Sequence, residues 1–555
     1  MLRLSYLELI EELIYSRKIY FDGYLPPGKW GVRHQRLRVQ SRLMKDLIIS
    51  FPTGSSRLPE NTYGAVKTGV ALSQTHFRHT KRPPNPPFLI PGVLEILRTD
   101  QKWGPLVEIV PGEADMYCAE YVRQHGGIVL TTDSDLLVTD LGVDGGVSFF
   151  DDVTHIGNSP ASVGLTALKF SSHAINDLLR LDNVGGLGRV AFEIQKHGLS
   201  LKEAKPRAEA IALTDSEQSE FREFMEEYSF KTYLPNDHAI QGILSTLDAR
   251  IAEIVVQALT LDGSGADDRG PRRMGMFLPV MIEDRSKKSA WHMSTAVREL
   301  AYGVLQRFSP YQARTVIEYR LLDASDRLGR VVDVPGPKEL LEQCSLLSST
   351  LKQIAGRFSD DKKQTLWLAF AVSQDILWSK LEQRAPLSTS LINNSKGNEN
   401  NGSPTPGNKE EGAYDWDIIH FTARVQATFY SLRMAKQFLE VVVHLSKKDD
   451  LILPTPMIEL REQLKDLPPI SEWPLVEDMS LALTAARKVK VLAAVTDILG
   501  LPAIESEDTS PSQESKPKIQ KGVWRALEAA SEQRKAEKRN RQPASVNRFA
   551  ALSIA

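Results

Sequence analysis

The sequence predicts an α/β protein, with a mostly parallel sheet flanked by helices and followed by a largely helical C-terminal region. Two observations predict this fold class. Over residues 1–160, short apolar runs that fit strands alternate with amphipathic runs that fit helices, an order typical of a parallel sheet covered on both faces. Beyond about residue 165, the apolar positions recur mainly at helical spacing.

Each early element has a local cause in the sequence. Short apolar runs that end at Gly or polar residues predict strands, and longer amphipathic runs predict helices, one of which has Pro at its first position. The predicted strands are KIYFDG (18–23), LVEIV (106–110), GIVLTT (127–132) and GVSFFDDV (146–153). The predicted helices are residues 1–17, the basic segment after the loop YLPPGK (24–29), PGVLEILRTD (91–100) and PGEADMYCAEYVRQHG (111–126).

Composition excludes several classes of protein. The formal net charge is −2, so any attraction to nucleic acid must come from local patches. The chain has two cysteines, Cys118 and Cys344, which rules out a disulfide scaffold and a cysteine-rich zinc site. No apolar run approaches the ~20 residues of a membrane span, and the N-terminal stretch lacks the pattern of a secretory signal, so no membrane partner is expected.

Carboxylates follow three of the predicted strands. Asp22 ends the first, Glu113 and Asp115 open the helix after the second, and Asp133 and Asp135 follow the third. Functional groups of open α/β sheets gather at the carboxyl ends of parallel strands, so these acids converge if the strands are neighbours. Crowded carboxylates repel one another, and divalent cations relieve that repulsion. Mg²⁺ and Mn²⁺ prefer oxygen ligands, and two such ions about 4 Å apart clamp a phosphodiester for in-line hydrolysis.

A simpler interpretation exists for each acid taken alone. Carboxylates are common at helix N-termini, where they cap free amides and meet the positive end of the helix dipole, and in solvated loops. Five acids at successive strand ends in this order favour a metal site over five separate caps.

The ordered motifs resemble a known family. The order FDG, PPGK and a following Arg, then VPGEADMYCAEYV, then TTDSDLL, resembles the flap endonuclease/XPG superfamily of structure-specific nucleases, and more closely its fungal Asteroid branch. The later text MFLPVMIEDRSKKSAWHMSTAVRELAYGVL and RTVIEYR is also similar to that branch. The resemblance is densest over residues 15–200 and continues more loosely to about 335. It implies a PIN-like fold.

The resemblance implies roles for particular residues. The five acids match the family's ligands for two Mg²⁺ or Mn²⁺ ions, with Asp115 in place of the usual second Glu. Lys29 matches a lysine that contacts the scissile phosphate, and Arg36 matches an arginine on the same helix, where cations stabilise the charge that develops on phosphate. The alternative for both is a solvated basic helix face. Trp30, beside Lys29, is a candidate base-stacking platform, with a place in the core as its alternative.

Two features differ from the family pattern. Members begin with a Gly-rich start and a strand that bears a further metal-binding acid, and this sequence starts after that point. We therefore expect either an incomplete gene model or a protein without that ligand and with unpaired strand edges. The family's duplex-gripping helix–two-turn–helix module resembles INDLLRLDNVGGLGRVAFEIQKHG but is shortened here. Within it, Asp182 matches the last metal-site acid, and three glycines allow backbone amides to approach phosphate: Gly185, Gly186 and Gly188.

The expected organisation follows from these assignments. It consists of a PIN-like XPG nuclease domain (1–160), a helical region with the shortened module and an Asteroid-type extension (161–392), a polar low-complexity linker (393–412), a helical segment (413–505) and a basic tail (506–555). The tail is a candidate arm for a protein partner, and its basic runs are compatible with nuclear targeting, with a cytoplasmic location as the alternative.

Two functions remain open from the sequence. The first is a metal-dependent endonuclease that cuts branched or overhanging nucleic acid, DNA in preference to RNA. The second is a catalytically weak or inactive relative that binds RNA or proteins as a scaffold in post-transcriptional regulation or signalling. The retained acids and the Lys29–Arg36 pair favour the first, and the absent N-terminal acid favours the second.

Overall fold

The computed structural model confirms the α/β fold class that the sequence predicts. It describes residues 18–56, 84–156, 164–234, 240–260, 274–307, 309, 313–321, 328–358, 363–395, 413–448 and 452–502. The predicted helix at 1–17, most of the predicted linker and the whole predicted tail lie outside these residues.

Two pairs of parallel strands lie at the centre of the α/β region. Strand β1 (Ile19–Asp22) pairs with β3 (Val107–Val110), and β4 (Gly127–Thr131) pairs with β5 (Gly145–Phe149). All four strands coincide with predicted ones. The acids were expected to converge if the three strands that precede them are neighbours. Strands β1 and β3 are paired directly, whereas β4 belongs to the other pair.

Helix α5 (Ala114–His125) packs against all four of these strands and so spans the two pairs. It begins after Gly112, which closes the turn that leaves β3, and ends at Gly126, whose positive φ of 71° suits a residue without a side chain. Strands β1 and β4 are not hydrogen-bonded to each other, and Ile128 of β4 is 53% exposed. The facing edges of β1 and β4 are therefore open in the described part of the chain.

Two further helices hold this region in place. The single turn η1 (Pro27–Lys29) leads into α2 (Trp30–Ser50), the predicted basic helix, and α4 (Leu89–Thr99) precedes β3. On α2, Leu37, Ser41 and Met44 form the buried side, at the spacing of one helix face. The rest of α2 carries the basic residues that the sequence analysis considered for nucleic-acid contact.

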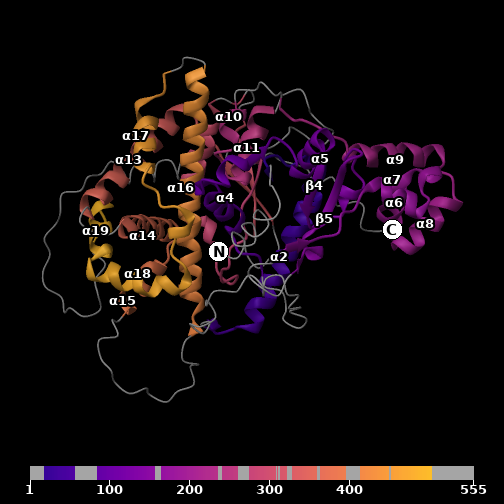
Figure 1. Ribbon diagram of the computed structural model, residues 1–555. Helices are drawn as coiled ribbons and strands as arrows, with labels where there is room; N and C mark the ends of the chain where they lie inside the picture. The colour runs from indigo at the N-terminus through magenta and orange to yellow at the C-terminus, as the bar shows by residue number, and fades with distance from the viewer. Residues whose placement is uncertain are drawn as a thin grey trace, which may run out of the picture.

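A small helical lobe follows the second strand pair. It contains α6 (Ser172–Leu179), the turn η7 (Asp182–Val184), α7 (Gly186–His197), α8 (Leu201–Ala210) and α9 (Asp215–Glu227). Leu181, Val190, Ala204 and Ala208 form a core of its own. Figure 1 shows this lobe on the side of β4 and β5 away from the C-terminal helices.

The remainder is mainly helical, with one sheet inside it. Strands β8 (Met274–Phe277) and β9 (Thr315–Tyr319) are parallel, and β10 (Gly329–Asp333) is antiparallel to β9. Short antiparallel pairs join β6 (Thr154–Ile156) to β7 (Gly164–Thr166) and β2 (Ser55–Ser56) to β11 (Ala413–Tyr414). The helices are α10 (Gln241–Leu244), α11 (Ala249–Thr260), α12 (Thr295–Gln306), α13 (Pro337–Arg357), α14 (Lys363–Leu381), α15 (Leu387–Asn394), α16 (Trp416–Lys448), α17 (Thr455–Leu464), α18 (Val476–Lys488) and α19 (Val491–Ile498).

One large hydrophobic core joins the strands to the C-terminal helices. It runs from Ile109 of β3 through Ile254 of α11 and Tyr302 of α12 to Phe438 of α16. The long helix α16 lies between the α/β region and the other C-terminal helices, as Figure 1 shows. Among the described helices, none has both the length and the apolar character that crossing a membrane requires.

Candidate functional site

The carboxyl end of β1 lies beside the first turn of α5. In the β1–β3 register Asp22 is opposite Val110, from which two residues lead to Glu113, the N-cap of α5. The carboxylate of Asp22 accepts a hydrogen bond of 2.8 Å from the backbone amide of Ala114. Asp22 thus binds one of the free amides of this helix N-terminus, where negative charge is favoured.

Lys29 joins this group from the end of η1. Its ammonium lies 2.7 Å from the carboxylate of Glu113, with side chains 44% and 22% exposed. Burial lowers the pKa of Lys29, but the hydrogen bond and the charge of Glu113 outweigh this, and the net shift is upward. Lys29 is therefore a fully charged cation among carboxylates.

Asp115 occupies the most crowded position. Its pKa is raised to about 6, first because burial penalises the charged form, and then because three carboxylates repel its charge: Asp22, Asp133 and Glu113. Lys29 offsets part of this effect. The charges of the acids of β1, α5 and the segment after β4 therefore interact, even though β4 lies in the second strand pair.

The segment after β4 is held by its own hydrogen bonds. The amide of Asp133 donates to Thr131 Oγ1 at 3.0 Å, and the amide of Asp135 donates to the Asp133 carboxylate at 3.0 Å. The Asp133 carboxylate thus binds the amide of the first residue of the single turn η4 (Asp135–Leu137), whose N-cap is Ser134. The pKa of Asp135 is raised, first by burial and then by the charge of Asp133. Asp133 therefore both orders this segment and adds its charge to the acidic group.

The end of α9 adds two residues that the sequence analysis did not consider. Burial raises the pKa of Tyr228 to about 12, and the charges of Asp135, Glu227 and Asp133 add to this. The charge of Glu227 also acts to raise the pKa of Lys29 and that of Asp135. No local signal in the sequence distinguishes Glu227 from Glu226. Only the fold of the helical lobe decides that the charge of Glu227 acts on Lys29 and Asp135.

The donors match a hard divalent cation in chemistry but not in spacing. Carboxylate oxygens are the ligands that Mg²⁺ and Mn²⁺ prefer, and the pKa of Asp115 is raised first by burial and then by the charges of neighbouring carboxylates. Within the described ranges, however, no three His, Cys, Asp or Glu side chains gather closely enough to hold a metal ion. Metal binding at these acids thus requires the β1–α5 group and the Asp133–Asp135 segment to move closer together.

Arg36 and Trp30 have different surroundings on α2. Arg36 is exposed, and among the described residues it forms no ion pair with an acid. The ring of Trp30 packs edge-on against Phe277 and Tyr319 of the β8–β9 sheet, with centroid distances of 6.0 Å and 5.8 Å, and its Nε1 donates to the carbonyl of Leu25 at 3.4 Å. These contacts give Trp30 a packing role between α2 and the sheet.

The glycines of the helical lobe have structural roles. Gly185 and Gly186 have φ values of 98° and 68°, which a side chain disfavours, and the Gly186 amide donates to the Leu181 carbonyl at 3.0 Å. A Cβ on Gly188 would lie 2.7 Å from Met225 Sδ of α9, so this glycine allows close helix packing. The backbone of Asp182 lies in η7, and its side chain is outside the described part of the structure.

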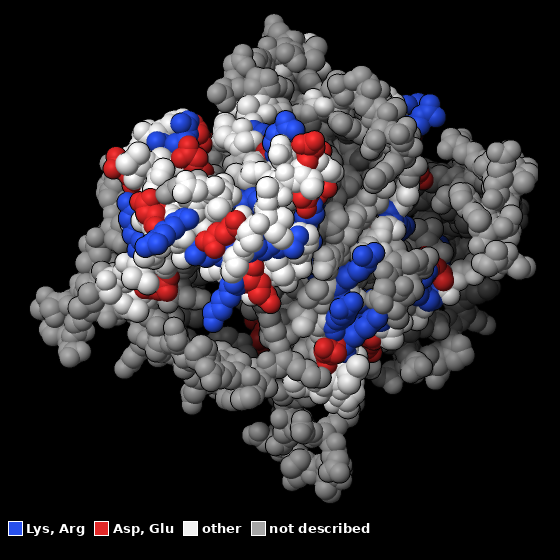
Figure 2. Space-filling model, turned by 90° about the vertical axis from the view of Figure 1, so that its right-hand side faces the viewer, with Lys and Arg blue, Asp and Glu red and all other residues white. Residues whose placement is uncertain are grey.

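The described surface in Figure 2 carries charges of both signs. On its left part Lys and Arg are interspersed with Asp and Glu, and right of centre several Lys and Arg lie together. Attraction to a polyanion on this face therefore depends on such small groups of cations.

Comparison with known families gives one match. Residues 85–327 match the family model described as XPG domain containing. This segment of the chain is therefore similar to XPG domains, which are typical of nucleases. No curated protein and no solved structure gave a significant match.

The limits of the family match divide the predicted site. The matched segment contains the acids of α5, those after β4 and Asp182, but it begins after Asp22, Lys29 and Arg36. The structure nevertheless brings Asp22 and Lys29 to the start of α5 in the matched segment, through the hydrogen bond to Ala114 and the ion pair with Glu113.

Proposed function

We propose that this protein is a metal-dependent, structure-specific endonuclease that hydrolyses phosphodiesters in branched or overhanging nucleic acid, DNA in preference to RNA. The observation that carries the proposal is that Asp22 and Lys29 both bind the start of α5, through the Ala114 amide and the Glu113 carboxylate, next to the half-buried Asp115. Acids that repel one another beside a cation, in a segment similar to XPG domains, suit a site that takes up divalent cations and a phosphate.

The residues divide into two roles. Asp22, Glu113, Asp115, Asp133 and Asp135, with Asp182 as a sixth, would hold two Mg²⁺ or Mn²⁺ ions, which supply charge neutralisation and activation of water when bound. Lys29 forms an ion pair with Glu113 in the free protein. A substrate phosphate would be a second anion that the Lys29 ammonium can bind. The Lys29 ammonium then stabilises the charge that develops on the scissile phosphate, and Arg36 adds a cation further along α2.

Several finer assignments belong to the same proposal. The motifs FDG, VPGEADMYC and TTDSDLL support membership of the fungal Asteroid branch. A nuclear location and a protein partner for the basic tail follow from the substrate class and from the composition of residues 506–555.

The test is Mg²⁺-dependent cleavage of labelled flap, splayed and hairpin DNA by the full chain. Asp133→Asn is compared with wild type, and Asp46→Asn, which removes an exposed acid of α2, is the matched control. We expect cleavage by wild type and by Asp46→Asn, and its loss in Asp133→Asn. Equal cleavage by wild type and Asp133→Asn would place the activity in another site or a contaminant.

A second function is favoured by one specific observation. The strand pairs β3–β1 and β4–β5 are separate, and the described acids do not form a close metal-ligand group. This arrangement suits a catalytically inactive scaffold that binds RNA or proteins. Fluorescence anisotropy with labelled single-stranded RNA in EDTA tests it. Binding without any cleavage when Mg²⁺ or Mn²⁺ is added would support the scaffold and reject the nuclease.

A further inference from the structure

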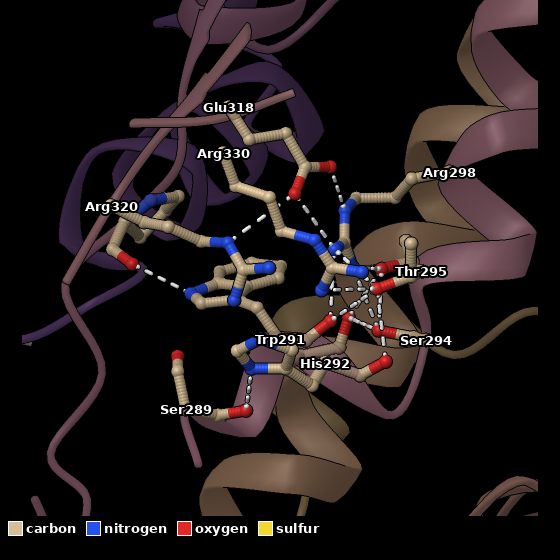
Figure 3. Close-up of polar contacts among 12 residues, drawn as sticks. Ser289, Trp291, His292, Ser294, Thr295, Arg298, Glu318, Arg320 and Arg330 are labelled. Carbon is tan, nitrogen blue, oxygen red and sulfur yellow. Dashed lines mark hydrogen bonds and ion pairs between the residues drawn. The ribbon is translucent and has the colours of Figure 1, made fainter. Parts of the chain in front are cut away.

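Three arginine side chains surround one glutamate inside the protein. Arg298 comes from α12, Arg320 follows β9, and Arg330 lies on β10, while Glu318 lies on β9 between them. Figure 3 shows the three guanidinium groups around Glu318, with Trp291 and His292 of the turn η8 (Ala290–His292) below.

Arg298 is fully satisfied and uses most of the capacity of Glu318. Its Nε and Nη2 both donate to the Glu318 carboxylate, the latter at 3.0 Å. Nη1 donates to Ser294 and Ser431 at 3.0 Å and 3.1 Å, and Nη2 also donates to the Trp291 carbonyl at 2.8 Å. This bidentate pair is a complete structural unit that joins α12 to β9.

Arg320 has a charge but no hydrogen-bond acceptor. Its side chain is 0% exposed, and its Nε lies 3.3 Å from Glu318 in an ion pair without hydrogen-bond geometry. Its three guanidinium nitrogens have no hydrogen-bond partner among the described residues. Arg330 is half-buried beside it and has one long hydrogen bond, 3.4 Å, from Nη1 to Thr295 Oγ1.

Nearby acids do not restore the charge balance. Burial raises the pKa of Glu283 to about 7, so this carboxyl group is only partly ionised near neutral pH, and it already accepts a hydrogen bond from the Ala290 amide. The pKa of His292 is lowered to about 3, first by burial and then by the charges of Arg320 and Arg330, so the imidazole is neutral. The charges of Glu299 and Glu382 act to raise the pKa of Arg330, which burial lowers. Next to Arg320, positive charge therefore exceeds negative charge.

The excess of unpaired donors continues towards α14. The ring of Trp378 contacts the guanidinium of Arg384 at 3.5 Å and that of Arg424 at 4.8 Å, and it stacks on His292 at 6.4 Å. Arg424 binds Asp375 at 2.8 Å, but its Nε and two nitrogens of Arg384 lack hydrogen-bond partners in the described part of the chain. The same interior therefore holds several buried N–H groups that need acceptors.

A buried guanidinium without an acceptor carries a large free-energy penalty. Water would satisfy the N–H groups but not the charge, whereas an oxyanion satisfies both, and the planar guanidinium matches phosphate oxygens in a bidentate geometry. A nucleic-acid backbone is too large to reach a side chain that is 0% exposed. The structure points to a small phosphate-bearing anion: we propose that Arg320 and Arg330 bind the phosphate group of such a molecule as an internal ligand.

The test uses thermal unfolding of the full chain in EDTA, with potassium phosphate compared with potassium chloride of equal ionic strength. We expect phosphate to raise the Tm of wild type by several degrees and chloride not to do so. In Arg320→Gln the phosphate shift disappears, while the Tm without phosphate stays near or above that of wild type, because an unpaired buried charge is gone. Arg461→Gln, whose guanidinium binds Glu440 on α16, keeps the full shift.

Two readouts make the result decisive. If Arg320→Gln fails to fold, Arg330→Gln, at a half-buried position, replaces it and should lose most of the shift. Purified wild type is also denatured and assayed for released phosphorus, where free phosphate and an organic phosphate are separated by mass spectrometry. Either released species at about one per chain supports the proposal. Neither a specific phosphate shift nor released phosphorus, or an undiminished shift in both variants, overturns it.

Discussion

The ammonium of Lys29 lies 2.7 Å from the carboxylate of Glu113, and this ion pair ties the start of α2 to the start of α5. Both side chains are partly exposed, so solvent weakens the attraction. We expect Lys29→Met to cost less than about 1 kcal/mol in the free energy of unfolding. Cleavage should fall much more, by roughly 10²–10³-fold, because a cation beside a reacting phosphate acts mainly in the transition state. Urea unfolding and single-turnover cleavage measure the two effects, and parallel losses would show a merely structural role.

Asp115 should destabilise the protein when no metal is present. A carboxyl group whose pKa is raised in the folded state binds its proton more tightly there, so stability falls as pH rises from about 4 to about 6 and then stays low. In EDTA at pH 8, the free energy of unfolding of Asp115→Asn should therefore exceed that of wild type by about 1–2 kcal/mol, after allowance for solvent screening.

The same residue gives a metal prediction with the opposite sign. Mg²⁺ requires the charged carboxylate, so the rise in Tm that Mg²⁺ gives wild type should be large at pH 8 and small at pH 5, and should shrink in Asp115→Asn at both. Differential scanning fluorimetry measures this. A Mg²⁺ effect that is independent of pH would remove Asp115 from the metal site.

Glu318 should be among the most sensitive buried positions. Burial opposes its charge, but Arg298 and Arg320 lower its pKa to about 2, so its stabilising contribution is present above about pH 4.5 and is lost as pH falls towards 2. Glu318→Gln leaves Arg298 without its partner and should cost about 3–5 kcal/mol in urea unfolding. Glu342→Gln, which breaks an exposed contact of 4.0 Å with Lys338, should change stability by less than about 0.5 kcal/mol.

Gly188 should be less tolerant of a side chain than an exposed helical glycine. A Cβ there would lie 2.7 Å from Sδ of the flexible Met225 side chain, so Gly188→Ala should force Met225 out of its present position at a cost of about 1 kcal/mol. Gly356→Ala on α13 is the control, because its Cβ would have no atom within 4 Å. That change should stabilise by about 0.5–1 kcal/mol through helix propensity. Equal effects of both substitutions in thermal unfolding would contradict the packing role of Gly188.

Much of the α/β region was predictable because its signals are local. KIYFDG, LVEIV, GIVLTT and GVSFFDDV all contain strands, and PGEADMYCAEYVRQHG contains α5, because apolar period and helix-ending glycines act within a few residues. The strands β8–β10, inside a region read as mainly helical, were missed because each is short and depends on pairing with a strand elsewhere in the chain.

The candidate site was predictable only in part, for a related reason. Strand ends showed which carboxylates belong to the edge of a sheet, and so placed Asp22 and Glu113 together. They did not show that β4 pairs with β5 alone, or that Glu227 of α9 approaches from the helical lobe. They also did not show that Trp30 packs on Phe277 and Tyr319.

By itself, the sequence determined the fold class, the order of strands and helices, and the residue types that end them. Only the tertiary structure decided how close the acids come and that Lys29 forms an ion pair with Glu113. It alone decided that Arg320 is buried without a hydrogen-bond acceptor among the residues that the structure describes. The physical reason is range. Backbone preference and side-chain period act over a few residues, whereas charge balance in the interior depends on which distant segments pack together.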